Sequence, residues 1–233
     1  MADPAETCFS WGTLRERGTA RVRELVRQGA QLPVRLWRWA PIIQLGAQHR
    51  SRVERHLLSL GSHDRYLRFG YPASDERIRQ YAQSLDFEGD EVFGIFNRRL
   101  ELIAIAHLAY LQDTTAGRVL RMAEFAVSVR ATARGRGLGN RLFAHATRHG
   151  RNRGVDRLFI HALSENTVML RIARQAGASV QREGSESEAW LQLPPVTLRT
   201  RAEALLARHL AQLNYAYKLQ TRQICRLVDR LSA

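Results

Sequence analysis

The sequence predicts an α/β (α+β) fold in which a mixed, mostly antiparallel, twisted sheet of about six to seven strands is flanked by helices. Three consecutive apolar strands between residues 91 and 129 are typical of an antiparallel meander. A glycine-rich turn then leads from the last of these strands into a helix, and a second strand–helix unit follows. The chain has 233 residues and is 45% apolar, which is enough for a sizeable core.

The segments before the meander are expected to supply one strand and two helices. Residues 34–39 alternate as a possible first strand, and residues 48–60 carry valine and leucine at helical spacing. Residues 62–69 are expected to form a polar and aromatic connection. Ser74 is the expected N-cap of a second helix, which extends to Leu85.

The later elements follow from apolar runs separated by turn residues. A hairpin turn is expected at residues 97–99, and Gly154 and Gly177 are expected to end helices. In chain order, these elements are strands at 91–96, 100–111 and 122–129, a helix at 138–152, a strand at 157–163, a helix at 164–177, and strands at 178–181 and 189–193.

Two extensions are expected to flank a central domain of residues 32–195. Residues 1–31 are interpreted as a basic amphipathic N-terminal arm. Residues 196–233 are interpreted as a long C-terminal helix and possible coiled coil, because apolar residues recur from Leu210 at alternating steps of four and three. This helix could form a homodimer or dock on its own domain, and the sequence leaves both alternatives open.

The net charge of +14 raises the question of a nucleic acid or an anionic membrane as partner. Nine of these excess charges lie in residues 1–50 and 197–233, so the basic character sits largely outside the expected core, and a solvated basic surface is the preferred interpretation. Cys8 and Cys225 fit no disulfide framework or metal-ligand spacing and are interpreted as free thiols. No signal peptide or apolar membrane span is evident, which makes the cytoplasm the expected location.

Residues 122–143 carry the features most relevant to function. Phe125, Val127 and Val129 alternate with more polar positions, one of which is Glu124. The glycine-rich turn that follows allows positive φ angles and close approach to the backbone. The helix after it begins with unpaired N–H groups and a positive dipole end. The stretch therefore predicts an anion site for a nucleotide-like cofactor.

The turn Arg134-Gly-Arg-Gly-Leu-Gly fits the Arg/Gln-x-x-Gly-x-Gly/Ala signature of the GCN5-related N-acetyltransferases (GNAT). The element order over residues 32–193 also resembles that family, and residues 122–177 are similar to the acetyltransferase domain of bacterial protein lysine acetyltransferases. The resemblance implies acetyl-CoA (coenzyme A) as cofactor, with its pyrophosphate on the turn and its pantetheine arm along the preceding strand. The residues implied to bind it are Val127, Val129, Arg134, Gly135, Arg136, Gly137, Leu138, Gly139, Asn140 and Asn166.

The same resemblance implies an amine acceptor, either a protein lysine or a small molecule. A lysine-like amine has a pKa near ~10.4 and must lose a proton before it attacks. Glu124 is the expected general base, and His161 is a weaker alternative. Ala173 stands where the family often has a tyrosine general acid, while Tyr66 and Tyr110 are other conceivable acids.

Several assignments remain alternatives at this point. Asn166 could be a helix N-cap instead of a cofactor ligand. The chain could be a non-catalytic acyl-CoA-binding module, or a basic protein associated with nucleic acid or a membrane. The acceptor itself is not specified, because residues 61–73 and 182–188, which could line its site, carry no diagnostic motif.

Overall fold

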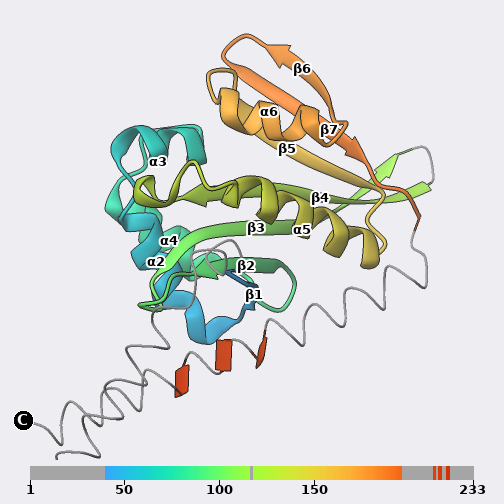
Figure 1. Cartoon of the computed structure of the whole chain (residues 1–233). Coiled ribbons are helices and arrows are strands. Elements are labelled where there is room, and N and C mark those ends of the chain that lie inside the picture. Colours follow the sequence, from blue (N-terminus) through green and yellow to red (C-terminus); the bar gives the residue numbers. More distant parts are fainter. Residues whose placement is uncertain (1–39, 116–117, 196–211, 214, 217–218, 221–233) are drawn as a thin grey trace, which may run out of the picture. The chain divides into compact units, whose positions relative to one another are not determined.

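The computed structural model describes residues 40–115 and 118–195, together with residues 212, 213, 215, 216, 219 and 220. Its seven described strands form one sheet in the order β1-β2-β3-β4-β5-β7-β6 (Figure 1). All neighbouring strands are antiparallel except β4 and β5, which are parallel. This arrangement confirms the predicted mixed, mostly antiparallel sheet.

The strands are β1 (Ile42–Leu45), β2 (Glu91–Phe96), β3 (Leu102–Thr115), β4 (Arg118–Val129), β5 (Arg157–Leu163), β6 (Ser179–Glu183) and β7 (Glu186–Gln192). The α-helices with described bounds are α2 (Arg50–Leu58), α3 (Ser62–Phe69), α4 (Asp75–Ser84), α5 (Leu138–Asn152) and α6 (Thr167–Gln175). Short 3-10 turns at Ala47–His49 and Ala131–Ala133 precede α2 and α5.

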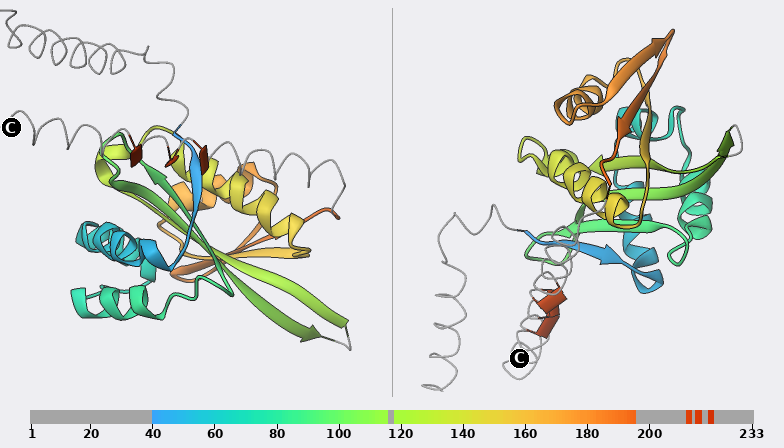
Figure 2. Two further views of the ribbon diagram at one scale, coloured as in Figure 1. Left: turned by 90° about the horizontal axis from the view of Figure 1, so that it is seen from below. Right: turned by 90° about the vertical axis from the view of Figure 1, so that its right-hand side faces the viewer.

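Helices cover both faces of the sheet (Figure 2). Alternate residues of β3 show how the two cores arise, because successive side chains of a strand point to opposite faces. Ala104, Ala106 and Leu108 are fully buried in the core that contains α5 and α6. Ile105 belongs instead to the second core, which contains residues of α2 and α4. The sheet therefore lies between two layers of helices, and each of its faces contributes to one of the two cores.

The edge strand β1 lies later in the chain than the strand expected at residues 34–39, which are outside the described residues. Ile42–Leu45 pairs antiparallel with β2 and buries its alternate residues Ile43 and Leu45. The meander strands β3 and β4 are longer than expected, because their pairing continues to Thr115 and begins again at Arg118.

The main error in the predicted elements concerns residues 62–69, which form helix α3 and not a connection. The helix begins after the extended residue Gly61 and ends at Gly70, which has a φ of 80° and whose N–H donates to Tyr66 O (2.8 Å). None of its residues is fully buried. Unlike α2 and α4, the helix therefore contributes no fully buried residue to a core.

Other predicted helix ends are confirmed. Ser74 is the N-cap of α4, and its Oγ accepts a hydrogen bond from Arg77 N (3.3 Å). Gly154 and Gly177 follow α5 and α6 with φ angles of 79° and 88°, in the left-handed region that glycine adopts at low cost. The hairpin after β2 closes with Asn97 N donating to the carbonyl of residue 101 (3.0 Å).

The expected N-terminal arm, Cys8 and Cys225 lie outside the described residues. The six described residues of the C-terminal segment are helical. Tyr215 packs on the Phe96 ring (5.2 Å between ring centroids) and accepts a hydrogen bond from Arg52 Nη1 (2.8 Å). Leu213, on the predicted heptad seam, is 67% exposed. Among the described helices, none is long and apolar enough to cross a lipid bilayer.

Candidate active site

The parallel strands β4 and β5 pair only over a short stretch. Their last paired residues are Glu124 and Phe159, whereas β4 continues to Val129 and β5 continues in pairing with β7 to Leu163. The two strands therefore diverge after Glu124. Beyond this point, within the described strands, the edge of β4 that faces β5 has no neighbour in the sheet.

The backbone groups of Val127 and Val129 point into this opening. The N–H of Arg130 donates to β3 (2.9 Å), and the carbonyl of Arg121 accepts from the residue just before β5 (2.8 Å). Successive residues of an antiparallel strand direct their hydrogen-bonding groups to opposite sides. The odd-numbered residues of β4 therefore direct theirs toward β5. An extended ligand could pair with this free edge as an added strand does.

Glycines shape the turn between β4 and α5. Gly135 and Gly137 have φ angles of 74° and 69°, and a Cβ atom on either would meet no neighbouring atom within 4 Å. The backbone conformation is thus the reason for glycine at these two positions. Gly139 has a different reason, because its Cβ would lie only 3.2 Å from Ile172 Cδ1 on α6. Close packing of α5 on α6 depends on it.

The first turn of α5 presents free donors at the same place. Gly137 is the N-cap, and Arg141 N is the first donor within the helix, to Gly137 O (3.0 Å). The N–H groups of Leu138, Gly139 and Asn140 therefore have no partner in the preceding turn of the helix. The 15-residue helix adds the positive end of its dipole. This geometry suits a phosphate or pyrophosphate.

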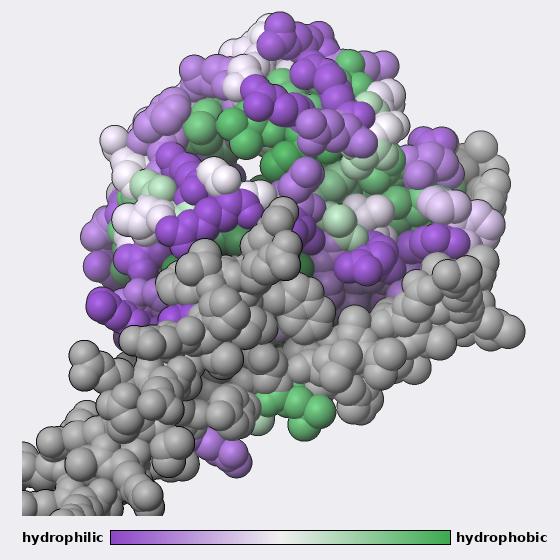
Figure 3. Space-filling model, viewed as in Figure 1, coloured by the Kyte–Doolittle hydropathy of each residue, from purple (hydrophilic) through white to green (hydrophobic). Residues whose placement is uncertain are grey.

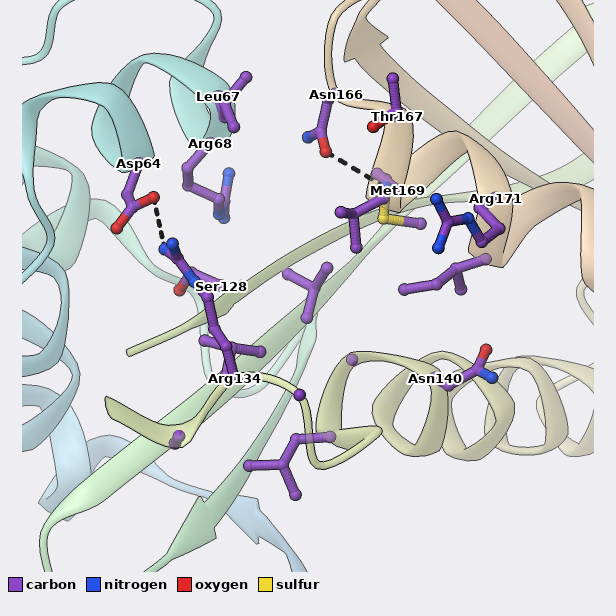
Figure 4. A pocket seen from close by; sticks show the side chains of 18 of the residues that line it. Asp64, Leu67, Arg68, Ser128, Arg134, Asn140, Asn166, Thr167, Met169 and Arg171 are labelled. Carbon is purple, nitrogen blue, oxygen red and sulfur yellow. Dashed lines mark hydrogen bonds and ion pairs between the residues drawn. The ribbon is translucent and has the colours of Figure 1, made fainter. Parts of the chain in front are cut away.

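The strand edge and the turn share one cavity of about 760 Å³, walled by α3, β4, the turn and the N-terminus of α6 (Figure 4). In the space-filling view a hollow lies between α3 and α6, with apolar residues beside it and hydrophilic residues around it (Figure 3). Its lining includes nine of the ten predicted cofactor residues, namely Val127, Val129, Arg134, Gly135, Gly137, Leu138, Gly139, Asn140 and Asn166.

The tenth residue, Arg136, does not line the cavity. It is exposed, and its Nη2 donates to Thr132 O (3.3 Å). Asn166 is the N-cap of α6, since its Oδ1 accepts a hydrogen bond from Met169 N (3.2 Å), and it also lines the cavity. The two roles considered for Asn166 are compatible, because the amide nitrogen is a separate donor.

Helix α3 supplies a wall that sequence reasoning missed. It contributes His63, Asp64, Leu67 and Arg68 to the lining. Asp64 forms an ion pair with Arg134, which joins α3 to the glycine turn (Figure 4). The signal that could have revealed this wall is the spacing of Asp64, Leu67 and Arg68, which places them on one side of a helix.

Glu124 lies at the point where β4 and β5 separate. Ser128 shares its side of the strand and faces α2, where Ser128 Oγ is 2.9 Å from His56 Nε2. Glu124 is therefore directed to the face covered by α2, α3 and α4, where it is half-buried. It is not among the residues that line the cavity, whose nearest lining residue on β4 is Val127. Its role as general base stays a prediction.

The other conceivable acids and bases lie outside the cavity. His161 is exposed and pairs with Glu186 (3.1 Å). The hydroxyl of Tyr110 is buried, and burial raises its pKa. Tyr66 is half-buried, and Ala173 is completely buried in the core. No tyrosine lines the cavity, and no group of three His, Cys, Asp or Glu residues in the described part of the chain could hold a metal ion.

Solved structures share this fold. The GNAT domain of PAT from S. lividans matches with a TM-score of 0.55 and 20% identity, over 65% of this chain and 89% of that chain. The yncA protein from Salmonella typhimurium, solved with acetyl-CoA, matches with a TM-score of 0.50 and 13% identity, over 67% and 95%. A GNAT-family acetyltransferase from Streptococcus pneumoniae gives 0.50 and 13%, over 66% and 98%. The curated proteins contain no match.

The family comparison matches the part of the chain that builds the cavity. The acetyltransferase (GNAT) family model covers residues 60–178, just over half of the chain. This range begins before α3 and ends after α6, so it includes the diverging strands, the glycine turn and every wall of the cavity. The chain therefore belongs to the GNAT acetyltransferase family.

Proposed function

We propose that the protein is an acetyl-CoA-dependent N-acetyltransferase that moves an acetyl group to a primary amine by direct attack. The observation that carries this proposal is the union, in one cavity, of the free β4 edge with the N-terminus of α5. The amide groups of a pantetheine arm would pair with the free β4 edge, and a pyrophosphate would bind to the N–H groups at the N-terminus of α5. The yncA structure, which shares the fold, was solved with acetyl-CoA.

The cofactor would be held largely by backbone groups. Val127 and Val129 would pair with the pantetheine arm, and the N–H groups of residues 136–140 would bind the pyrophosphate. Arg134 would add a charge at the phosphates when it turns away from Asp64, its present ion-pair partner. Asn166 would offer its amide nitrogen from the opposite wall of the cavity.

In the proposed reaction, the amine nitrogen forms a bond to the acetyl carbon and the carbon–sulfur bond of the thioester breaks. Glu124 takes the proton that the amine loses, directly or through a water molecule. The departing thiolate takes a proton from solvent. The position of Glu124 at the strand divergence, next to the free edge, supports this role.

Thiol release from acetyl-CoA, measured across amino acids, polyamines, aminoglycosides and protein substrates, tests the proposal. Glu124→Gln should keep acetyl-CoA affinity within about twofold and lower kcat by about 10² to 10⁴. Glu188→Gln is the matched control, because Glu188 is a half-buried glutamate on β7 of the same sheet. Undiminished turnover by Glu124→Gln would exclude it as the base. Tight CoA binding without thiol release for any acceptor would favour a non-catalytic binding module.

A further inference from the structure

Four hydrogen-bonded side chains connect the cavity to the sheet beside Glu124. Arg68 lines the cavity, and its Nη2 donates to Tyr81 Oη (2.8 Å). Tyr81 Oη lies 2.9 Å from His107 Nδ1, and His107 Nε2 lies 2.9 Å from Asp90 Oδ2. The chain thus passes from α3 through α4 to β3 and ends in the loop before β2.

The two ends of this chain set the direction of its hydrogen bonds when His107 is neutral. An ionised Asp90 can only accept, so His107 Nε2 donates to it, and the other oxygen of Asp90 accepts from Tyr110 N (3.1 Å). His107 Nδ1 is then an acceptor and receives the Tyr81 hydroxyl proton, while Tyr81 Oη accepts from Arg68, which can only donate. Each member has a partner on both sides, so the chain holds the Arg68 guanidinium in a fixed place.

The charge of Arg68 is not neutralised by any carboxylate within the described residues. Asp64, one helical turn earlier, pairs with Arg134 instead. The guanidinium lies against the rings of Phe69 and Tyr81, 5.1 and 5.3 Å from their centroids. Its Nε is buried without an acceptor. One wall of the cavity therefore carries a positioned cation that has no ion-pair partner among the described residues.

Arg68 is connected by hydrogen bonds to the part of the sheet beside Glu124. Along α3 the chain advances by roughly 6 Å from Asp64, which contacts the turn, to Arg68. The chain of hydrogen bonds from Arg68 reaches β3 at His107, which pairs with Ala126, between Glu124 and the cavity. Burial is the main reason that the pKa of His107 is lowered, but the positive charge of Arg68 also lowers it and the negative charge of Glu124 raises it. Both charges therefore lie near the same imidazole.

We propose that Arg68 selects the acceptor by binding a carboxylate located close to the reacting amine, so that free amino acids and related small amino carboxylates are the preferred substrates. This inference rests on the proposed function, in which Glu124 receives the proton of the amine. A planar guanidinium matches a carboxylate in charge and geometry. A polyamine, or a lysine flanked by basic residues, would instead bring a second cation toward Arg68, which forms no ion pair within the described residues.

The test compares an acceptor that has a carboxylate beside its amine with its amide and with two acceptors of other classes. The full-length protein is assayed for thiol release with L-leucine, L-leucinamide, spermidine and a lysine-containing peptide. We expect kcat/KM for leucine to exceed that for leucinamide by at least about tenfold, as loss of a charged hydrogen bond predicts. In Arg68→Gln this ratio should fall to near one. Arg68→Lys keeps the positive charge but lacks the paired N–H donors of the guanidinium, and it should give an intermediate ratio.

Arg171→Gln is the control, because Arg171 lines the same cavity from α6 and its loss should leave the ratio unchanged. Equal use of leucine and leucinamide by the unmodified protein would overturn the inference. An equal loss for both acceptors in Arg68→Gln would also overturn it, since Arg68 would then support the reaction without selecting the substrate. The absence of thiol release with every acceptor would overturn the proposed function and the inference with it.

Discussion

A single methyl group at Gly137 should separate the effect of the glycine turn on stability from its effect on cofactor binding. Gly137→Ala forces a side chain into a φ of 69°, which costs about 1–2 kcal/mol for a non-glycine residue. No clash adds to this cost, because the new Cβ would meet no neighbouring atom. The expected decrease in Tm is roughly 2–8 °C for a domain of this size. The same methyl group, however, would occupy space in the cavity that we assign to the pyrophosphate.

Gly177→Ala supplies the matched comparison. Gly177 has a φ of 88°, its Cβ would also meet nothing within 4 Å, and it does not line the cavity. Differential scanning fluorimetry should therefore show similar Tm decreases for both variants. Calorimetric titration with CoA should show at least about tenfold weaker binding for Gly137→Ala alone, about 1.4 kcal/mol. Equal CoA affinities in the two variants would refute the assignment of the turn to the pyrophosphate.

Three further predictions concern stability and assembly. Burial lowers the pKa of His56 to about 4, so its neutral form stabilises the fold fully above pH 6.5. The contribution of His56 alone should lower the free energy of unfolding by roughly 3 kcal/mol between pH 6.5 and 4. In urea titrations, His56→Gln should flatten this dependence only in part, because His145 has a similar pKa. Glu91→Ala removes a carboxylate that is 2% exposed and pairs with two basic residues at the end of α5. It should lower the free energy of unfolding by roughly 2–4 kcal/mol, and a loss within the ~0.5 kcal/mol usual for surface sites would contradict this. Residues 196–233 either form a homodimer or dock on the domain; if they form the dimer, truncation after Pro195 should give a monomer in sedimentation velocity, and an unchanged oligomeric state would exclude the tail as the dimer element.

The sequence was most informative where local chemistry determines the structure. The glycine turn could be read because positive φ at Gly135 and Gly137 requires a residue type that is visible in the sequence. The meander strands and helix α4 followed from alternating apolar residues and from the Ser74 cap. Helix α3 was missed because it has no fully buried residue, and its ends depend on glycines that are equally typical of a loop.

The pairs that complete the site could not be predicted in this way. Asp64 contacts Arg134 across 70 positions of the chain, and Tyr81 contacts His107 across 26. The residue pattern of a single helix or strand does not predict such pairs, since each depends on how a helix packs against the sheet. Glu124 was identified by its place on an apolar strand, but its position at the strand divergence, outside the cavity lining, follows only from the pairing register.

The cofactor part of the site was predictable and the proposed acceptor part was not, because the two parts are built from different chemical groups. The cofactor part of the site consists mainly of backbone groups, the edge of Val127 and Val129 and the first N–H groups of α5, so the main-chain path is enough to form it. The Arg68 part consists of side chains from α3, α4 and β3. Substitutions of Arg68 and Tyr81 can therefore change acceptor choice while the backbone contacts to the cofactor stay intact. Tyr81→Phe is the mildest such change, because it removes only the hydroxyl that holds Arg68; it should reduce the preference for leucine over leucinamide without altering CoA affinity.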